Sequence, residues 1–396
     1  MAPSEIWIKG ILLVLSILIS FTYLSKTWGE QRAEESVQAF SHSSKNIRER
    51  SNDFGIGFDL TASYGTVAVS YANGTTLSIA KVDGSEKYCE TWQRLSLDSS
   101  RHIAPPYDNM GDLWDDEPRQ QLRKLRKRIG LPASADVGNI ADLLAALRDK
   151  ANDFVQEKFT TAVATIPHLV AVYNEDITDA LEHVGLNMHG IWYYEHLVYE
   201  TISAYAGLGL GLCRNYTNAA DCLDTQREWE RDIIMPVLYT RSALTMSFAP
   251  VRGAYFLWEP SYRHRVDFDL GSDKLASLQT PEEVKRYWSQ VRTKLVEVMV
   301  ERPAYDKPHK IILMGESASD PEFVRNLWLA LATVMDRAPV LLDADPLFAA
   351  AKGAAEFAKR APYTDQWWEI SWNKSHNLTI PTWRHNQKKM AVGLHA

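Results

Sequence analysis

The chain has 396 residues, of which 45% are hydrophobic and 11% aromatic. This composition supports a substantial core in one large or two medium domains, and it excludes a disordered chain. The formal net charge of −7 and the pI near 5.9 exclude nucleic acid as the main partner, because phosphate binding needs clustered lysine and arginine.

The N-terminus carries an apolar run from Ile6 to Leu24 that only Lys9 interrupts. About 20 apolar residues span a bilayer as a helix. The run lacks a small-x-small cleavage site, which favours an uncleaved signal anchor over a signal peptide. Basic residues lie on both sides of it, so the positive-inside rule does not fix its orientation. We therefore predict a membrane anchor over 1–28 and a polar stalk over 29–52.

Cysteines and glycosylation sequons bear on that orientation. Cys213 and Cys222 flank a polar loop that a disulfide would close in an oxidising compartment, although three unpaired thiols fit the sequence equally well. The N-x-Ser/Thr sequons begin at Asn73, Asn215, Asn373 and Asn377. These features favour a single-pass membrane protein of the endomembrane or secretory pathway, with its main domain lumenal or extracellular.

The folded part is predicted to begin near 53 with three β-rich runs, FGIGFDL, GTVAVSYA and TLSIAKV. Asn73-Gly74 separates the second run from the third and is a strong hairpin signal, because both residues tolerate positive φ. An antiparallel meander is therefore expected. The basic run from Arg119 to Arg128 predicts the solvated face of a helix that ends at Gly130.

Strand and helix then alternate. From 136 onward the apolar spacing is helical, in a helix expected to run towards Phe159. The run TAVATIP predicts a strand, and NEDITDALEHVGL predicts a helix with its N-cap at Asn174 and its stop at Gly185. A strand followed by a capped helix is typical of α/β proteins.

The second half repeats this pattern. The run MPVLYTRSALTMSFAPVRGAYFLW has β character with a turn at Arg252-Gly253, a long helix opens at Pro281, and KIILMGE is a buried strand. A final helix is expected from Asp345. The predicted parts of the folded chain are a first lobe over 53–235, a reduced second lobe over 236–360 and a Trp-rich tail over 361–396.

Five segments carry a family resemblance. They are GFDLTASYGTVAV around Asp59, AVATIP with NEDITDALEHVGL, YETISAYAGLGLG around Glu200, IILMGESASDPEFV around Gly315, and DADPLFAAAKGAAEFAKR. In this order they resemble landmarks of the ATPase domain of seventy-kilodalton heat-shock chaperones, a member of the actin-like superfamily. The resemblance spans Phe54 to Arg360. It implies an α/β, two-lobed actin-like (ribonuclease H-like) ATPase fold, here preceded by one transmembrane helix, whose final helix returns to the first lobe.

The resemblance also implies roles for particular residues. In that family two turns hold phosphate oxygens with backbone amides, and a strand-end acid holds magnesium through water. It implies that Asp59 is catalytic and holds magnesium, that Glu200 lies near the attacking water, and that ATP or ADP with Mg is the cofactor. The implied nucleotide contacts are Thr61, Ala62, Ser63, Tyr64, Gly315, Glu316 and Ser317.

The departures from the family fall on this chemistry. Thr61 and Glu316 stand where the family has glycines, and the second-lobe turn from Thr240 to Leu244 has neither an acid nor a glycine. A β-branched residue resists positive φ, and without glycine the backbone cannot closely approach a γ-phosphate. The residues after Arg360 are too few for the chaperone's substrate-binding domain.

Three functions fit these observations. The first is a membrane-anchored, chaperone-like actin-fold protein with a degenerate nucleotide site, a weak or inactive ATPase that acts as a binding or scaffold module for a protein partner that the sequence does not specify. The second is a divergent active ATPase that hydrolyses ATP with Mg. The third is an accessory protein of a membrane-associated or secretory-pathway biosynthetic process, with another small ligand in its cleft.

Overall fold

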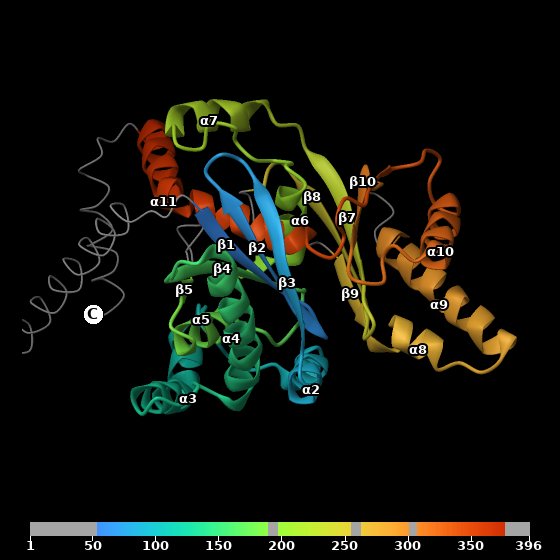
Figure 1. Cartoon of the computed structure of the whole chain (residues 1–396), viewed down its shortest axis with the longest axis horizontal. Coiled ribbons are helices and arrows are strands. Elements are labelled where there is room, and N and C mark those ends of the chain that lie inside the picture. The colour runs from blue at the N-terminus through green and yellow to red at the C-terminus, as the bar shows by residue number, and fades with distance from the viewer. Residues whose placement is uncertain (1–53, 189–196, 255–262, 301–306, 377–396) are drawn as a thin grey trace, which may run out of the picture. The chain divides into compact units, whose positions relative to one another are not determined.

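The computed structural model describes residues 54–188, 197–254, 263–300 and 307–376, with side chains up to 363. All of them belong to one unit, Asp53–Ala396. The described part is a mixed α/β structure with two sheets and ten α-helices, which confirms the α/β class (Figure 1). The predicted anchor and stalk lie outside the described residues.

None of the helices in these described ranges is long and apolar enough to cross a bilayer.

The first sheet has the strand order β3-β2-β1-β4-β5, and β6 also pairs with β4. Strands β1 and β2, and β2 and β3, are antiparallel, whereas β1 and β4 are parallel. The bounds are β1 Phe54–Leu60, β2 Tyr64–Tyr71, β3 Thr76–Asp83, β4 Thr161–Ile166, β5 Asn187–Met188 and β6 Val198–Tyr199. The predicted meander and the strand TAVATIP are therefore confirmed.

The hairpin between β2 and β3 differs from the prediction in one detail. Gly74 has a φ of +89°, whereas Asn73 is not among the residues with positive φ. The amide of Gly74 donates to the carbonyl oxygen of Tyr71 (3.0 Å). One left-handed residue closes this turn because its loop is longer than the two-residue loop in which both positions need positive φ.

The second sheet has the order β11-β10-β7-β8-β9, so it repeats the strand order of the first. Its first three strands in sequence form an antiparallel meander, and β10 pairs in parallel with β7. The bounds are β7 Asp232–Tyr239, β8 Leu244–Val251, β9 Arg263–Asp267, β10 Lys310–Met314 and β11 Val340–Leu342. The sheet thus begins slightly before the predicted boundary at 236, and the sequence reasoning missed β9.

The helices form layers with the sheets. Helices α2, α4 and α5 pack on one face of the first sheet, α9 and α10 pack on the second, and α6 and α11 lie in the core between the sheets (Figure 1). The bounds are α2 Glu86–Leu95, α3 Met110–Arg128, α4 Ala135–Val155, α5 Asn174–His183, α6 Glu200–Gly207, α7 Ala219–Glu228, α8 Ser272–Ala276, α9 Pro281–Val300, α10 Pro321–Ala332 and α11 Ala349–His376.

Some helix boundaries correct the predictions. Helix α4 ends at Val155 rather than near Phe159, because Gln156 takes a left-handed conformation. The N-cap of α5 is Tyr173, whose amide donates to the Asp176 carboxylate, so Asn174 is already helical. The final helix begins at 349 rather than at Asp345 and extends into the predicted tail.

Glycines let α11 approach its neighbours closely. A Cβ on Gly353 would overlap the carbonyl oxygen of Ser203 in α6, and one on Gly207 would overlap that of Ala349. In β1, a Cβ on Gly55 or Gly57 would likewise meet the α11 backbone. Helix α11 therefore covers β1 and crosses α6 through backbone contact that no other residue type permits.

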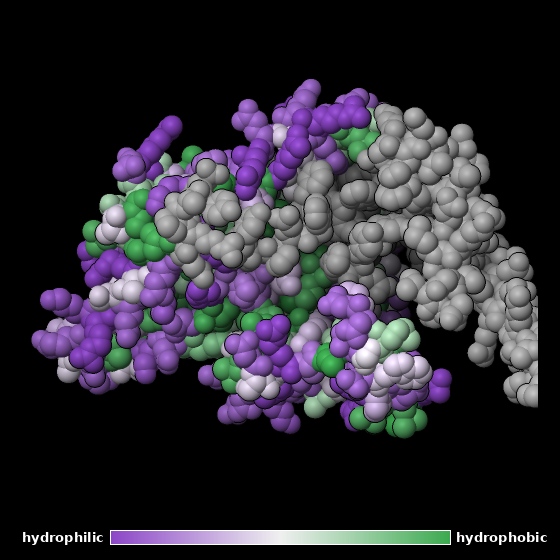
Figure 2. Space-filling view, turned by 180° about the vertical axis from the view of Figure 1, so that it is seen from behind, coloured by the Kyte–Doolittle hydropathy of each residue, from purple (hydrophilic) through white to green (hydrophobic). Residues whose placement is uncertain are grey.

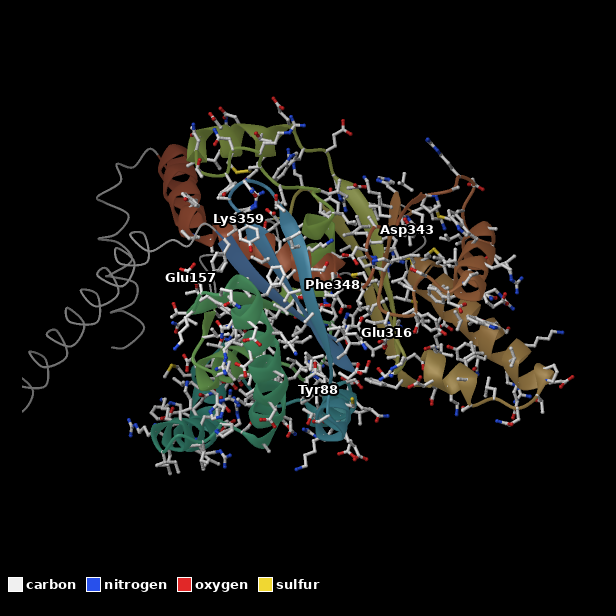
Figure 3. All side chains as sticks on the ribbon, in the orientation of Figure 1. Tyr88, Glu157, Glu316, Asp343, Phe348 and Lys359 are labelled. Carbon is white, nitrogen blue, oxygen red and sulfur yellow. A yellow bond between two sulfur atoms is a disulfide. The ribbon has the colours of Figure 1, made fainter. Side chains whose placement is uncertain are left out.

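A buried ion cluster fastens α11 to the first sheet. The Glu356 carboxylate accepts hydrogen bonds from Ser70 (2.5 Å) and Thr76 (3.1 Å) and pairs with Lys359 (2.8 Å) and Arg360 (2.8 Å). The Lys359 ammonium, labelled in Figure 3, also donates to the Ser70 hydroxyl of β2 (2.8 Å). These partners lower the pKa of Glu356 although burial opposes them.

The inner face of the basic helix α3 is not solvated as predicted. Arg123 is only 5% exposed and donates to the carboxylates of Asp176 (2.9 Å) and Asp179 (2.7 Å) in α5. Arg119 and Lys127, one turn away on either side, also pair with acids of α5. The cations at four-residue spacing lie on one helix face, and α5 supplies carboxylates opposite them.

Cys213 and Cys222 form a disulfide, with their Cα atoms 5.2 Å apart, and Cys89 is free and half-buried.

Of the sequon asparagines, Asn73 and Asn215 are exposed, Asn373 lies in the backbone of α11, and Asn377 lies outside the described residues. Glycosylation stays a prediction at all four.

Candidate functional site

The turn between β1 and β2 is closed by one of its own side chains. The Thr61 hydroxyl accepts hydrogen bonds from the amides of Tyr64 (3.1 Å) and Ser63 (3.4 Å) and donates to the Tyr64 carbonyl oxygen (2.8 Å). Gly84 and Tyr88 hold the turn from outside, because they donate to the carbonyl oxygens of Ser63 (2.8 Å) and Thr61 (2.7 Å). Two amides of the implied phosphate-binding turn are therefore already hydrogen-bonded.

The turn between β7 and β8 has the same arrangement. The Thr240 hydroxyl accepts a hydrogen bond from the Ala243 amide (3.1 Å) and donates one to the Ala243 carbonyl oxygen (3.1 Å). Thr240 and Thr61 both lack positive φ. The two turns share the pattern Thr-x-Ser, as TAS and TRS, at the same place in two sheets of equal strand order. This repeated pattern was the sequence signal that the prediction did not use.

Asp59 lies two residues before the first turn, near the end of β1. It is buried, and its carboxylate accepts a hydrogen bond from the Thr165 hydroxyl of β4 (2.8 Å). Burial raises the pKa of Asp59 to about 7, although this hydrogen bond favours the charged form. Leu238 occupies the matching position before the second turn, so that turn lacks an acid.

Glu200, the first residue of α6, is a second buried carboxyl beside Asp59. Burial raises its pKa well above the usual range, and the negative charge of Asp59 raises it further. Its Oε2 atom has no hydrogen-bond partner among the described residues. The structure thus brings the two predicted acids into one poorly solvated site, where burial favours the protonated form of Glu200.

Uncharged polar side chains continue this site towards the second sheet. The Thr201 hydroxyl contacts His168 Nε2 (3.0 Å) and the Ser247 hydroxyl (2.6 Å), and the His168 ring stacks on Tyr199. Burial, and secondarily His264, lowers the pKa of His168 to about 3, so this histidine is neutral. No sequence motif pointed to His168 or Ser247, because they come together only through the fold.

Gly315 begins the turn after β10, as the resemblance implied. Its φ is +101°, and a Cβ there would overlap the Tyr239 carbonyl oxygen. The next residues anchor this turn to the second sheet, since the Ser317 amide donates to that same oxygen (3.1 Å) and the Ser317 hydroxyl contacts Ser272 (2.9 Å). Glycine is therefore required at 315 by its positive φ and by the closeness of the Tyr239 backbone.

Glu316 connects the two sheets. Its carboxylate pairs with Lys81 of β3 (2.7 Å) and with the Arg241 guanidinium (3.4 Å), and it also accepts the Arg241 amide (3.2 Å). Asp83 adds contacts to Lys81 (2.5 Å) and Arg241 (4.0 Å). We call Lys81, Asp83, Arg241 and Glu316 the inter-sheet ion cluster; Figure 3 shows Glu316 between β3 and the second sheet.

The predicted nucleotide contacts therefore fall into two groups. Thr61, Ala62, Ser63 and Tyr64 are buried at the first turn near Asp59, and Gly315, Glu316 and Ser317 belong to the second sheet. The inter-sheet ion cluster joins the groups, and the Lys81 ammonium lies 4.8 Å from the centre of the Tyr64 ring. Sequence reasoning flagged Glu316 but missed Lys81 and Asp83, which lie far from it in the chain.

Among the described residues, no three histidine, cysteine or acidic side chains are placed to hold a metal ion. Asp59 and Glu200 are only two, and burial favours their protonated forms.

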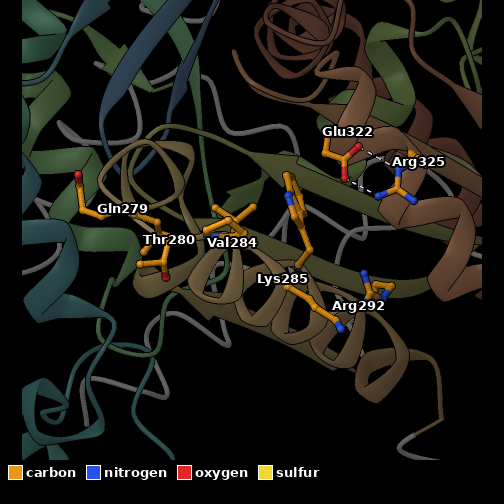
Figure 4. Close-up of a pocket in the computed structure, with 10 residues that line it drawn as sticks. Gln279, Thr280, Val284, Lys285, Arg292, Glu322 and Arg325 are labelled. Atoms are coloured by element: carbon orange, nitrogen blue, oxygen red, sulfur yellow. Dashed lines mark hydrogen bonds and ion pairs between the residues drawn. The ribbon is translucent and has the colours of Figure 1, made fainter.

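A pocket of 480 Å³ lies elsewhere, between α9, α10 and the loop before α9 (Figure 4). Glu322 and Arg325 form an ion pair at its edge (2.5 Å). Its lining consists of Leu278, Gln279, Thr280, Pro281, Val284, Lys285, Trp288, Arg292, Glu322 and Arg325. No predicted site residue lines it, so this pocket is separate from the site around Asp59.

Neither a known family model nor a curated protein matches this sequence.

Proposed function

We propose that 53–360 is an actin-like, two-lobed domain with a degenerate nucleotide site, which acts as a membrane-anchored binding or scaffold module rather than as an efficient ATPase. The fold part of the proposal is supported by the two sheets of equal strand order and by α11, which follows the second sheet in the chain but covers β1 of the first. A duplicated lobe with a returning final helix is what the resemblance implied.

The observation that carries the functional part is the closure of both turns by their own threonines. A phosphate-binding turn needs amides that are free to donate and backbone that can approach the anion. Here the hydroxyls of Thr61 and Thr240 already occupy amides of their turns. Phosphate binding would have to break these hydrogen bonds within the protein.

The charges at the same place support this proposal. Glu316 puts a carboxylate between the two turns, where it would repel phosphate, and it engages the nearby cations Lys81 and Arg241. Leu238 provides no second acid for magnesium. The residues present therefore do not fit ATP with Mg as the family holds it.

The cellular setting follows the same proposal. The disulfide between Cys213 and Cys222 and the exposed sequon at Asn73 suit an oxidising, lumenal or extracellular compartment. With the apolar N-terminal run, they support a single-pass protein whose main domain faces that side. In this setting the folded domain would act as a scaffold by binding a protein partner, without turnover of a substrate.

Thermal unfolding of the full chain tests the nucleotide part. We expect 5 mM ATP or ADP with Mg to leave the melting temperature unchanged, whereas a ligand at about 100 times its Kd stabilises by about 2.7 kcal/mol. The matched variant Thr61→Gly/Thr240→Gly/Glu316→Gly removes both threonine hydroxyls, so that the amides of both turns are free to donate, and it also removes the Glu316 carboxylate. A magnesium-dependent rise in wild-type melting temperature that Asp59→Ala abolishes would refute the proposal.

A second candidate is a divergent ATPase, favoured by the unpartnered Oε2 of buried Glu200 beside Asp59. Buried carboxyls with raised pKa values are common at functional sites. Phosphate release by the full chain tests this candidate. Activity that Glu200→Gln removes, with the melting temperature retained, would favour it, and equal background release by both proteins would exclude it.

A further inference from the structure

Helix α3 has its charged face inward and its apolar face outward. The cations at Arg119, Arg123 and Lys127 face the acids of α5. Four large apolar side chains of the same helix, and that of its C-cap Ile129, are between 54% and 68% exposed; the four are Met110, Trp114, Leu122 and Leu125. Figure 2 shows apolar residues on the surface over α3. This orientation is opposite to that of an ordinary surface helix.

The five apolar residues form a stripe along one side of the helix, which the exposed side chains of Gln121 and Arg128 interrupt. An α-helix turns about 100° per residue, so the stripe covers an arc of about 120°, opposite the arc that holds the inward cations. The helix has 19 residues and is therefore about 28 Å long. Single exposed apolar residues are normal, but five large ones on one side of a helix indicate a surface that another molecule covers.

The charged side chains beside the stripe differ between its two ends. Asp115 is exposed and Glu117 half-buried in the N-terminal half, and in the C-terminal half Lys124 and Arg128 are exposed and Arg126, which donates to the Pro132 carbonyl oxygen (2.7 Å), is half-buried. On the helical wheel, Glu117 and Lys124 flank one side of the stripe, whereas Asp115 and Arg126 flank the other. Each side therefore has an acid near one end and a base near the other.

This pattern is self-complementary under two-fold symmetry. When two copies of α3 pack antiparallel, a two-fold axis near residue 120 places the same side of the stripe from both helices together, with opposite ends aligned. Glu117 then faces Lys124 of the second copy, and Asp115 faces Arg126. The apolar residues match as well, since Met110 falls opposite Ile129 and Trp114 opposite Leu125.

We propose that the outer face of α3 is an isologous interface between two copies of this chain, packed antiparallel through the apolar stripe. An anionic lipid surface fits less well, because it would repel Asp115 and Glu117 at one end of the stripe. One helix pair buries less area than the 1,200–2,000 Å² or so of a stable interface. The dimer is therefore weak, with a dissociation constant on the order of micromolar.

Sedimentation equilibrium of the full chain in mild detergent tests this proposal. We expect a monomer–dimer equilibrium, which Leu125→Glu abolishes by placing a charge in the stripe. The matched control is Leu329→Glu, because Leu329 is an exposed leucine on α10, away from α3. The control keeps the wild-type equilibrium. Both positions are exposed, so both variants keep the wild-type melting temperature.

Exchanging the charges of two residues beside the stripe distinguishes a second copy of this chain from any other molecule bound there. Glu117→Lys and Lys124→Glu each place like charges across the two-fold axis and raise the dissociation constant at least tenfold. The double variant restores opposite charges and returns the dissociation constant to within threefold of wild type. The proposal is overturned if wild type is monomeric, if Leu125→Glu leaves the dimer intact, or if the double variant fails to recover.

Discussion

The two sheets share a backbone plan but differ in chemistry. Both have the same strand order and a Thr-x-Ser turn after the first strand. The first sheet keeps a buried acid, Asp59, two residues before that turn, and the second has Leu238 at the matching place. The second sheet thus has the same strand order and turn closure without a carboxylate at this position, because the hydrogen bonds within the turn do not involve that residue.

The largest effect is expected where the two halves meet. Gly353→Val should lower the free energy of unfolding by about 5 kcal/mol or more, because its Cβ overlaps the Ser203 carbonyl oxygen and forces α6 and α11 apart. Denaturant unfolding measures this. In the control Gly138→Ala, near the start of α4, the Cβ meets only the Pro132 side chain, and stability should change by less than about 1 kcal/mol. Equal losses in both variants would contradict the close crossing.

The buried acid should make stability depend on pH in a definite direction. The folded-state pKa of Asp59, about 7, lies above its unfolded value of 3.8, so the folded state binds the proton more tightly. The free energy of unfolding then falls by up to about 4 kcal/mol as pH rises from about 4 to 7. Asp59→Asn should be more stable than wild type at pH 8 and equal to it at pH 4.

Melting curves of Asp59→Asn at several pH values measure this difference. The control is Asp142→Asn, at an exposed position on α4, which should leave the pH profile of wild type unchanged. A profile for Asp59→Asn that runs parallel to wild type would mean that another group causes the dependence.

The two turn threonines should contribute equally if the turns are equivalent. Thr61→Ala and Thr240→Ala each remove a hydroxyl that accepts a backbone amide, and each should lose about 1–2 kcal/mol. Denaturant unfolding measures both, and Thr61→Ser and Thr240→Ser, which keep the hydroxyl, should lose less. A large loss at one turn alone would break the proposed equivalence.

The smallest effect is expected from the inter-sheet ion cluster. Glu316→Gln weakens the pairs with Lys81 and Arg241 and should lose about 1 kcal/mol or less at low salt. Thermal melting should show this difference shrinking at 1 M salt, because ions screen partly exposed pairs. In Glu322→Gln, a local pair within α10 is weakened instead, and a similar salt effect there would argue against a special contribution from Glu316.

Much of the fold was predictable because its signals are local. Apolar periodicity located strands that the structure confirms. Asn73-Gly74 located a hairpin and Pro281 the start of a helix, and the structure confirms both. The placement of Asp59 at a strand end followed from the same local patterns, whereas Glu200 was singled out only by the family resemblance. Each of these features depends on residues within one or two turns of each other.

What could not be predicted depends on contacts between distant segments. The partners of Glu316 lie in β3 and in the turn after β7, and the carboxylates that face Arg123 lie in α5. A basic run looks the same in sequence whether its cations face water or acids. For that reason the inward face of α3 was predicted wrongly.

The position of α11 has a consequence for biosynthesis. Gly55 and Gly57 lie near the start of the folded chain, yet the helix that covers them begins at 349. During synthesis, the inner face of β1 therefore has no partner until nearly the whole chain has left the ribosome. Such late, long-range pairing slows folding and exposes apolar strands to aggregation. We therefore expect nascent chains that end before 349 to leave this face of β1 uncovered and to aggregate more readily than the full chain.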